Sequence, residues 1–313
     1  MTGTLADIIP PASTPAPPGG TARAALRTAR PRQWLKNVLV FAAPGAAGVL
    51  FHGHVLYRTL AAFGLFCVAS AGTYFLNDVL DAAQDRRHPT KRLRPVASGQ
   101  LPVPAAVGVA IGLMVVALGL SALLGPKFLV AMATYLVIPG VGYSLWLKHE
   151  PVFDIGAVAV GFIVRAVAGG LAAYVPLSDW FLIVASFGSL FMVVGKRYAE
   201  HLGLGVEAAD HRSTLGRYTV AYLRYVGAVS SAVAIAGYCL WAFEKATPNG
   251  YTVHGAIWFQ LSIAPFVLAI LRYALVLESG GGGAPEDVVL GDRALQALGA
   301  LWMLSFALGV YAL

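Results

Sequence analysis

Long apolar segments recur along almost the whole chain, and no other feature restricts its fold as strongly. A helix needs about 20 apolar residues to cross the hydrocarbon core of a bilayer, where only helices and closed barrels satisfy their backbone polar groups. The mean hydropathy is +0.71, and 12% of the residues are charged. We therefore predict an all-α, polytopic membrane bundle of about nine transmembrane helices, near residues 38–56, 59–76, 103–124, 128–147, 152–175, 180–195, 220–241, 256–272 and 294–313.

The distribution of cationic side chains predicts how this bundle is oriented. Lys and Arg accumulate in the cytosolic loops of membrane proteins. With nine crossings and a cytosolic N-terminus, 18 of the 22 Lys and Arg residues fall on the cytosolic side. We expect a multi-pass protein of the plasma membrane with its C-terminus outside, in contact with membrane lipid and not with nucleic acid. Whether it forms a homo-oligomer is left open.

Composition divides the chain into three parts. Residues 1–22 are rich in Pro, Gly and Ser and are predicted to form a disordered cytosolic tail. Residues 23–37 are basic and are predicted to lie on the membrane surface as an amphipathic segment, although their charge could also serve orientation alone. Residues 38–313 form the transmembrane domain. Both cysteines lie in apolar runs, which indicates small hydrophobic side chains instead of a metal site.

An acidic cluster follows the second apolar segment, in the stretch "NDVLDAAQD". Asp81 is four residues after Asn77, three after Asp78 and four before Asp85, which places all four on one face of a helix that continues from the segment. Carboxylates this close repel each other unless a cation lies among them. Mg2+ is bound in proteins by one or two carboxylates and by substrate phosphates. The spacing predicts a Mg2+–diphosphate site at the cytosolic membrane face.

A basic loop follows the acids. Pro89 and Pro95 prevent a continuous helix, so the cationic side chains between and around them can fold back over the carboxylates and contact phosphate oxygens. The candidates for phosphate binding in this loop are Arg87, Lys91 and Arg94, beside Arg86 and Arg92. The alternative is a solvated cytosolic loop whose charges pair with one another or with lipid.

These residues resemble the first aspartate-rich motif of the UbiA superfamily of intramembrane prenyltransferases. The family pattern N-D-x-x-D-x-x-x-D is present from Asn77 to Asp85, and its later R-P-x-x-S-G stands at 94–99. The resemblance implies a helical bundle around a central cavity that opens to the cytosolic face and to lipid. It also implies that Asp78, Asp81 and Asp85 are the catalytic, Mg2+-binding residues and that Asn77 contacts substrate.

A second region narrows the resemblance to one subgroup. Most aromatic prenyltransferases of the family carry a second D-x-x-x-D motif after the sixth span, whereas this chain has Lys196, Arg197, Tyr198 and Glu200 there. The stretches "RPRQWLKN" and "GKRYAE" are similar to the subgroup that transfers phosphoribosyl groups to decaprenyl phosphate for arabinan and cell-wall synthesis. The resemblance implies 5-phosphoribosyl diphosphate (PRPP) as donor, decaprenyl phosphate as acceptor, and a Mg2+-assisted in-line displacement that inverts C1.

Other polar residues are candidate substrate contacts with structural alternatives. Lys148 and Asp154 are expected to line the pocket, while Arg165 could line it or form a structural ion pair, because ions inside membranes usually face a cavity or a partner. Lys196 and Glu200 could instead form a helix-surface pair. Near the N-terminal interface, the side chains expected to hold a phosphate are Arg30, Arg32, Gln33, Lys36 and Asn37.

Two other functions fit the same residues. One is prenyl transfer from a prenyl diphosphate onto a quinone or haem precursor, which would use the same acidic motif. The other is a non-enzymatic transporter whose charges line a route for ions or head groups. Labelled PRPP and polyprenyl phosphate distinguish these functions, because only a phosphoribosyltransferase converts them into a labelled lipid.

Overall fold

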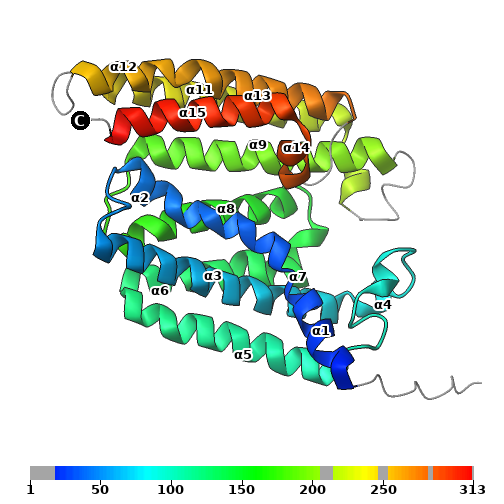
Figure 1. Ribbon diagram of the computed structural model, residues 1–313. Helices are drawn as coiled ribbons and strands as arrows, with labels where there is room; N and C mark the ends of the chain where they lie inside the picture. Colours follow the sequence, from blue (N-terminus) through cyan, green and yellow to red (C-terminus); the bar gives the residue numbers. More distant parts are fainter. Residues whose placement is uncertain (1–17, 205–213, 246–252, 281–284, 312–313) are drawn as a thin grey trace, which may run out of the picture.

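The computed structural model describes residues 18–204, 214–245, 253–280 and 285–311, and the regular structure of these residues is helical throughout. Figure 1 shows the long helices side by side, with their axes roughly parallel. This arrangement confirms the predicted all-α class.

Within the described residues, eight helices are long and apolar enough to cross a membrane. They are α3 (Gly53–Leu80), α5 (Val103–Ser121) with its extension to Leu124, α6 (Pro126–Tyr135) continued to Leu145 through a π-helix and α7 (Tyr143–Leu145), α8 (Phe153–Ala173), α9 (Asp179–Leu204), α11 (Val220–Lys245), α12 (Val253–Leu261) with α13 (Ile263–Glu278), and α15 (Arg293–Tyr311). Helix α1 (Pro18–Ala29) precedes these helices, and short helices occupy the connections: α4 (Ala82–Asp85), η3 (Lys91–Leu93), η6 (Leu147–His149), η8 (Leu215–Arg217) and α14 (Pro285–Gly291).

The first predicted span, residues 38–56, has a different form. It is replaced by a 3-10 helix, η2 (Pro31–Phe41), and by α2 (Ala42–Ala46), and the chain turns where Gly48 adopts a φ of 74°. A 3-10 helix rises about 2.0 Å per residue instead of 1.5 Å, so η2 and α2 together extend about 30 Å. The count of nine spanning α-helices is therefore not confirmed, although this segment has a length close to that of the hydrocarbon core.

The N-terminal boundary also differs from the sequence prediction. Helix α1 begins at Pro18, inside the stretch expected to be a disordered tail, while residues 1–17 lie outside the described residues. Arg30 follows α1 in the left-handed conformation, with a φ of 51°, and η2 then starts at Pro31. The predicted interfacial segment 23–37 is thus divided between α1 and η2.

Helix α8 lies at the centre of the bundle. It packs against η2, α3 and α6 on one side and against α9 on the other. Helices α1, α4 and α7 gather at one end of the bundle, and α15 finishes at the opposite end (Figure 1). The acidic motif is at the first of these ends, because it follows directly from the last turn of α3.

Candidate functional site

Two buried aspartates form the centre of the site. Asp78 and Asp85 are 1% and 3% exposed. Arg30 Nη2 lies 2.5 Å from Oδ1 of Asp78, and Arg94 Nη1 lies 2.7 Å from Oδ2 of Asp85 and 3.4 Å from Oδ1 of Asp78. The two arginine side chains are 30% and 28% exposed. The carboxylates are therefore enclosed, while both guanidinium groups also face outward.

Local structure explains this convergence. Helix α3 ends at Leu80, but the amides of Asp81 and Asp85 still donate to the carbonyls four residues earlier, so the chain keeps an approximately helical path through α4. The following loop folds back because Arg86 Nε donates to the carbonyl of Ala97 at 3.1 Å. This places Arg94 over the acids, as the proline positions predicted.

A cavity of about 210 Å³ opens beside Asp78. Arg27, Arg30 and Arg94 contribute three cations to its wall, and the remaining lining residues are Thr90, Leu93 and Pro95. Sequence reasoning missed Arg27 as a site residue. Its position three residues before Arg30 was the available signal, because that spacing places two side chains on neighbouring turns.

Asp81 lies in a different environment from the other two aspartates. Its Oδ1 is 2.5 Å from Nζ of Lys148, in η6. Nearby, Ser144 Oγ donates to Oδ1 of Asn77 at 2.7 Å. Asp78 and Asp85 are seven residues apart, almost two helical turns, so they lie nearly in line along the helical path, whereas Asp81 lies to one side of that line. The prediction of one shared helix face is therefore only partly met. Lys148 thus contacts the acidic motif through Asp81.

A second charged cluster occupies the neighbouring ends of α8 and α9. Arg197 is 3% exposed and donates to Asp154 Oδ2 and Glu200 Oε2, both at 3.0 Å. Tyr218 donates to the other oxygen of Asp154 and accepts from the amide of Val152 at 2.6 Å. Burial, and then the hydrogen bond to Asp154, raise the pKa of Tyr218 well above its ordinary value, so this hydroxyl stays protonated at neutral pH.

The charged residues of the "GKRYAE" stretch have different partners in the structure. Lys196 Nζ lies 3.9 Å from Glu200 one helical turn away, which matches the helix-surface alternative. Tyr198 donates at 2.6 Å to Glu278, and Glu278 also pairs with Arg224. Arg197, Tyr198 and Glu200 are thus engaged with protein partners. Residues 205–213 of the stretch compared with the second motif lie outside the described residues.

The remaining candidates differ in exposure: most are exposed or half-buried, and Asn37 is buried. Lys36 Nζ lies 2.5 Å from Gln33 Oε1, whereas Arg32 and Arg87 are exposed and Lys91 is half-buried. Asn37 is fully buried in the bundle, away from the interface where a phosphate was expected, and it accepts a hydrogen bond from Arg165 at 2.6 Å. Arg165 belongs to a buried polar network and has no ion-pair partner among the described residues.

The carboxylates offer hard oxygen ligands to a cation. No group of three His, Cys, Asp or Glu side chains in the described part of the chain is arranged to hold a metal ion. Arg94 Nη1 nevertheless reaches both Asp78 and Asp85, so one cationic atom can contact both carboxylates. Mg2+ needs only one or two carboxylates when phosphates supply its other ligands. Asp78 and Asp85 fit this requirement.

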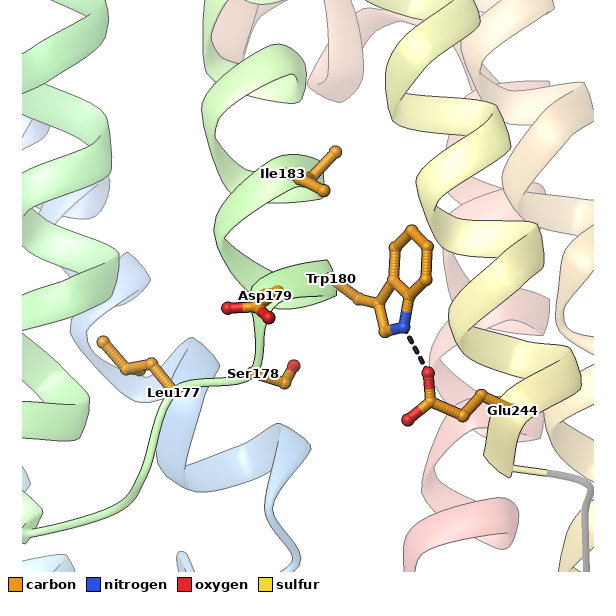
Figure 2. Close-up of a pocket in the computed structure, with 6 residues that line it drawn as sticks. All are labelled: Leu177, Ser178, Asp179, Trp180, Ile183 and Glu244. Carbon is orange, nitrogen blue, oxygen red and sulfur yellow. Dashed lines mark hydrogen bonds between the residues drawn. The ribbon is translucent and has the colours of Figure 1, made fainter.

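A larger cavity, of about 480 Å³, lies at the start of α9 and the end of α11, and Figure 2 shows its lining. Asp179 and Glu244 supply its charged groups, and Glu244 accepts a hydrogen bond from Trp180 Nε1. This cavity is at the end of the bundle opposite α1 and α4 (Figure 1). Its two carboxylates repel phosphate, so it does not suit a phosphorylated substrate.

Comparisons with known proteins identify the chain's relatives. It is 42% identical to the decaprenyl-phosphate phosphoribosyltransferase of Corynebacterium glutamicum, over 94% of this chain and 89% of that protein. It is 44% identical to the protein of the same name from Mycobacterium tuberculosis, over 92% of this chain and 94% of that protein.

The fold also has a solved counterpart. A UbiA homolog from Archaeoglobus fulgidus, solved with GPP and Mg2+ bound, superposes with a TM-score of 0.67 at 19% identity, covering 93% of this chain and 100% of that one. The model of the UbiA prenyltransferase family matches residues 38–290. The protein is therefore a multi-pass membrane protein with a UbiA-like helical bundle, and the chain belongs to the UbiA prenyltransferase family.

Proposed function

We infer that this protein transfers the 5-phosphoribosyl group of PRPP to decaprenyl phosphate and releases diphosphate. The product, decaprenylphosphoryl-5-phosphoribose, serves arabinan synthesis in the cell wall. The observation that carries this conclusion is the identity of 41–44%, over 92–95% of the chain, to proteins named decaprenyl-phosphate phosphoribosyltransferase. Membership in a transferase family also argues against the transporter alternative.

The charges around the cavity support two phosphorylated substrates. Three arginines and one aspartate line it, and both donor and acceptor carry negative phosphate groups. Two anions approach each other only where cations offset their repulsion. Arg30 and Arg94 are partly exposed and have N–H donors that the aspartates do not use, because a guanidinium carries five. We assign these two residues to the donor diphosphate.

The chemistry is a displacement at C1 of the ribose. The bond from C1 to the diphosphate oxygen breaks while an oxygen of the lipid phosphate bonds to C1 from the opposite side, so the configuration inverts. Charge grows on the departing diphosphate, and cations fixed beforehand near that position stabilise the transition state. The lipid phosphate is already anionic at neutral pH, so the reaction needs orientation of the nucleophile and no general base.

We assign Asp78 and Asp85 to a Mg2+ ion and Asp81 to the orientation of Lys148. The ion, when bound, would neutralise the diphosphate as a Lewis acid. The shared contact with Arg94 supports this assignment, because a cation between the two carboxylates is already tolerated there. Lys148 then presents its ammonium group at the same rim and adds a counter-charge for phosphate.

The site is assigned to the cytosolic face, with the N-terminus inside and the C-terminus outside. Of the 22 Lys and Arg residues, 18 fall in the segments that this orientation places on the cytosolic side, and this excess supports the orientation. PRPP is a highly charged, water-soluble donor, so it must reach the site from an aqueous compartment.

The test uses purified protein in lipid vesicles with PRPP labelled in the ribose, decaprenyl phosphate and Mg2+. We expect an organic-extractable labelled lipid that forms only when both substrates are present, and that is lost with EDTA and restored by Mg2+. Product with a prenyl diphosphate and an aromatic acceptor, without any labelled phosphoribosyl lipid, would overturn the assignment in favour of aromatic prenyl transfer.

A further inference from the structure

A cationic side chain with neutral partners lies inside the bundle. Arg165, in α8, is 6% exposed. Its Nε donates to Asn37 Oδ1 at 2.6 Å, its Nη1 to the carbonyl of Gly161 at 2.7 Å, and its Nη2 to the hydroxyls of Tyr135 at 2.8 Å and Ser70 at 3.3 Å. The guanidinium therefore connects η2, α3, α6 and α8 at one point.

A charge buried in this way is costly, and its side chain needs a compensating role. Arg165 has no carboxylate partner among the described residues. A neutral residue would fill the space at lower cost, but it could not aim several donors in the fixed directions of a guanidinium fork. The geometry of these donors, and not an ion pair, is what Arg165 contributes.

A second contact lies one turn further along α8. A Cβ on Gly169 would stand 1.8 Å from the carbonyl oxygen of Val40, so the backbone of η2 touches α8 here. Residues 165 and 169 share a face of α8, and residues three apart are eclipsed in a 3-10 helix, so Asn37 and Val40 lie in one row on η2. Both side chains of this row are fully buried. The two contacts fix the register of η2 along α8.

The register of η2 along α8 determines where Arg30 lies in the substrate site. Arg30 immediately precedes η2, and Trp34 Nε1 donates to the carbonyl of Ala29 at 2.9 Å, which ties the second turn of η2 to the end of α1. A slip of one residue in a 3-10 helix is a shift of about 2.0 Å. Such a shift would break the contact of 2.5 Å between Arg30 and Asp78.

We propose that Arg165 is a positioning residue for the substrate site: through Asn37 it sets the register of η2 on α8 and so holds Arg30 at Asp78. The proposal rests on the proposed function in one respect, since Arg30 is assigned there to the donor diphosphate. It predicts that Arg165 affects anion binding only through Arg30.

The test is a double-mutant cycle on the full-length protein, read as the Kd for inorganic diphosphate by calorimetry. Arg165→Gln and Arg30→Ala should each weaken binding roughly tenfold or more, the size expected for a lost hydrogen bond to a charged group. The double variant should bind no more weakly than Arg30→Ala alone. Multiplied effects of the two substitutions would overturn the proposal.

Asn37 provides the conservative comparison. Asn37→Asp keeps an oxygen that accepts from Arg165 and should retain the wild-type Kd, whereas Asn37→Leu has a similar size without an acceptor and should reproduce Arg165→Gln. If Arg165→Gln does not fold, the Kd values of these two Asn37 variants still test the proposal. Equal Kd values for the two Asn37 variants would contradict the proposal.

Arg58 is the matched control for a structural role. Its guanidinium donates to the carbonyl oxygens of Leu124, at 2.6 Å, and Ala172. Arg58→Gln should lower the unfolding temperature without changing the Kd. If Arg165→Gln behaves in the same way, it is structural only. Wild-type protein that binds diphosphate but makes no labelled lipid would refute the proposed function, while the cycle would still decide whether Arg165 positions Arg30.

Discussion

Lys148 Nζ and Asp81 Oδ1 lie 2.5 Å apart, so the middle aspartate of the acidic motif is held by a base that is distant in the chain. Asp81 is also the most accessible of the three, with 28% of its side chain exposed. The three aspartates are consequently not equivalent. Asp78 and Asp85 share Arg94 beside the cavity, whereas Asp81 determines where Lys148 can place its charge.

The pairing predicts a shared effect of Asp81 and Lys148. Asp81→Asn and Lys148→Met should each lower kcat/KM for PRPP by roughly ten- to a hundredfold, because each removes one charged hydrogen-bonding partner. The double variant should be no worse than the poorer single variant. Steady-state assays with labelled PRPP measure this, and additive losses would show that Asp81 acts independently, for example on the metal.

Asp78→Asn should affect the reaction and its Mg2+ dependence together. Loss of a preorganised electrostatic group typically costs 10²–10³-fold in rate, roughly 3–4 kcal/mol. We expect a reduction of this size and a shift of the half-maximal Mg2+ concentration to higher values.

The matched control for Asp78→Asn is Glu244→Gln, in the cavity at the opposite end of the bundle. It removes one carboxylate without touching the acidic motif, and product formation should stay near the wild-type rate. An Asp78→Asn enzyme with full activity and unchanged Mg2+ response would exclude Asp78 from the metal site.

Arg197→Gln should destabilise the protein. Removing one partner of a buried ion pair leaves a charge without compensation and costs about 3–5 kcal/mol, and Asp154 is fully buried. Thermal unfolding in detergent should show a clear drop in the midpoint. Arg224→Gln, which breaks a pair that is 57% and 42% exposed, should lower the midpoint only slightly, because water screens an exposed pair. Equal effects would mean that the Asp154 pair is solvated.

Gly169→Ala should displace η2 from α8. The added Cβ would overlap the carbonyl oxygen of Val40, which belongs to the backbone and cannot rotate away. Gly156→Ala is the control in the same helix, because nothing lies within 4 Å of its Cβ and helix propensity favours Ala. We expect Gly156→Ala to unfold at or above the wild-type temperature and Gly169→Ala well below it. Similar temperatures would refute the close contact.

The pair of Asp292 and Arg272 predicts a pH dependence of stability. Hydrogen bonds from Arg272 and from the amide of Leu295 lower the pKa of Asp292 below its ordinary value. The stabilisation is therefore complete above the ordinary pKa of an aspartate and is lost as pH falls through the lower, folded-state pKa. The difference in unfolding temperature between wild type and Asp292→Asn should be present at neutral pH and disappear in acid. A difference that persists in acid would contradict this assignment.

Several features followed from local sequence. Apolar runs of about 20 residues predict spanning helices because a bilayer core offers no other partner for backbone polar groups. The spacing from Asn77 to Asp85 and the prolines after it predict acids at a helix end with a basic loop folded over them. The contact of Arg94 with Asp78 and Asp85 confirms that part.

Other features depend on contacts between distant segments, and sequence alone did not determine them. The position of η2 against α8 is one such feature, because Gly169 admits the backbone of η2 and Arg165 binds Asn37. Asp81 meets Lys148 because the segment of α7 and η6 contacts the end of α3, and Arg197 pairs with Asp154 because α8 and α9 pack together. Residue types and spacings fix which charges are available, but the packing of helices decides which distant charges meet, since Asp81 and Lys148 are 67 positions apart and Asp154 and Arg197 are 43 apart.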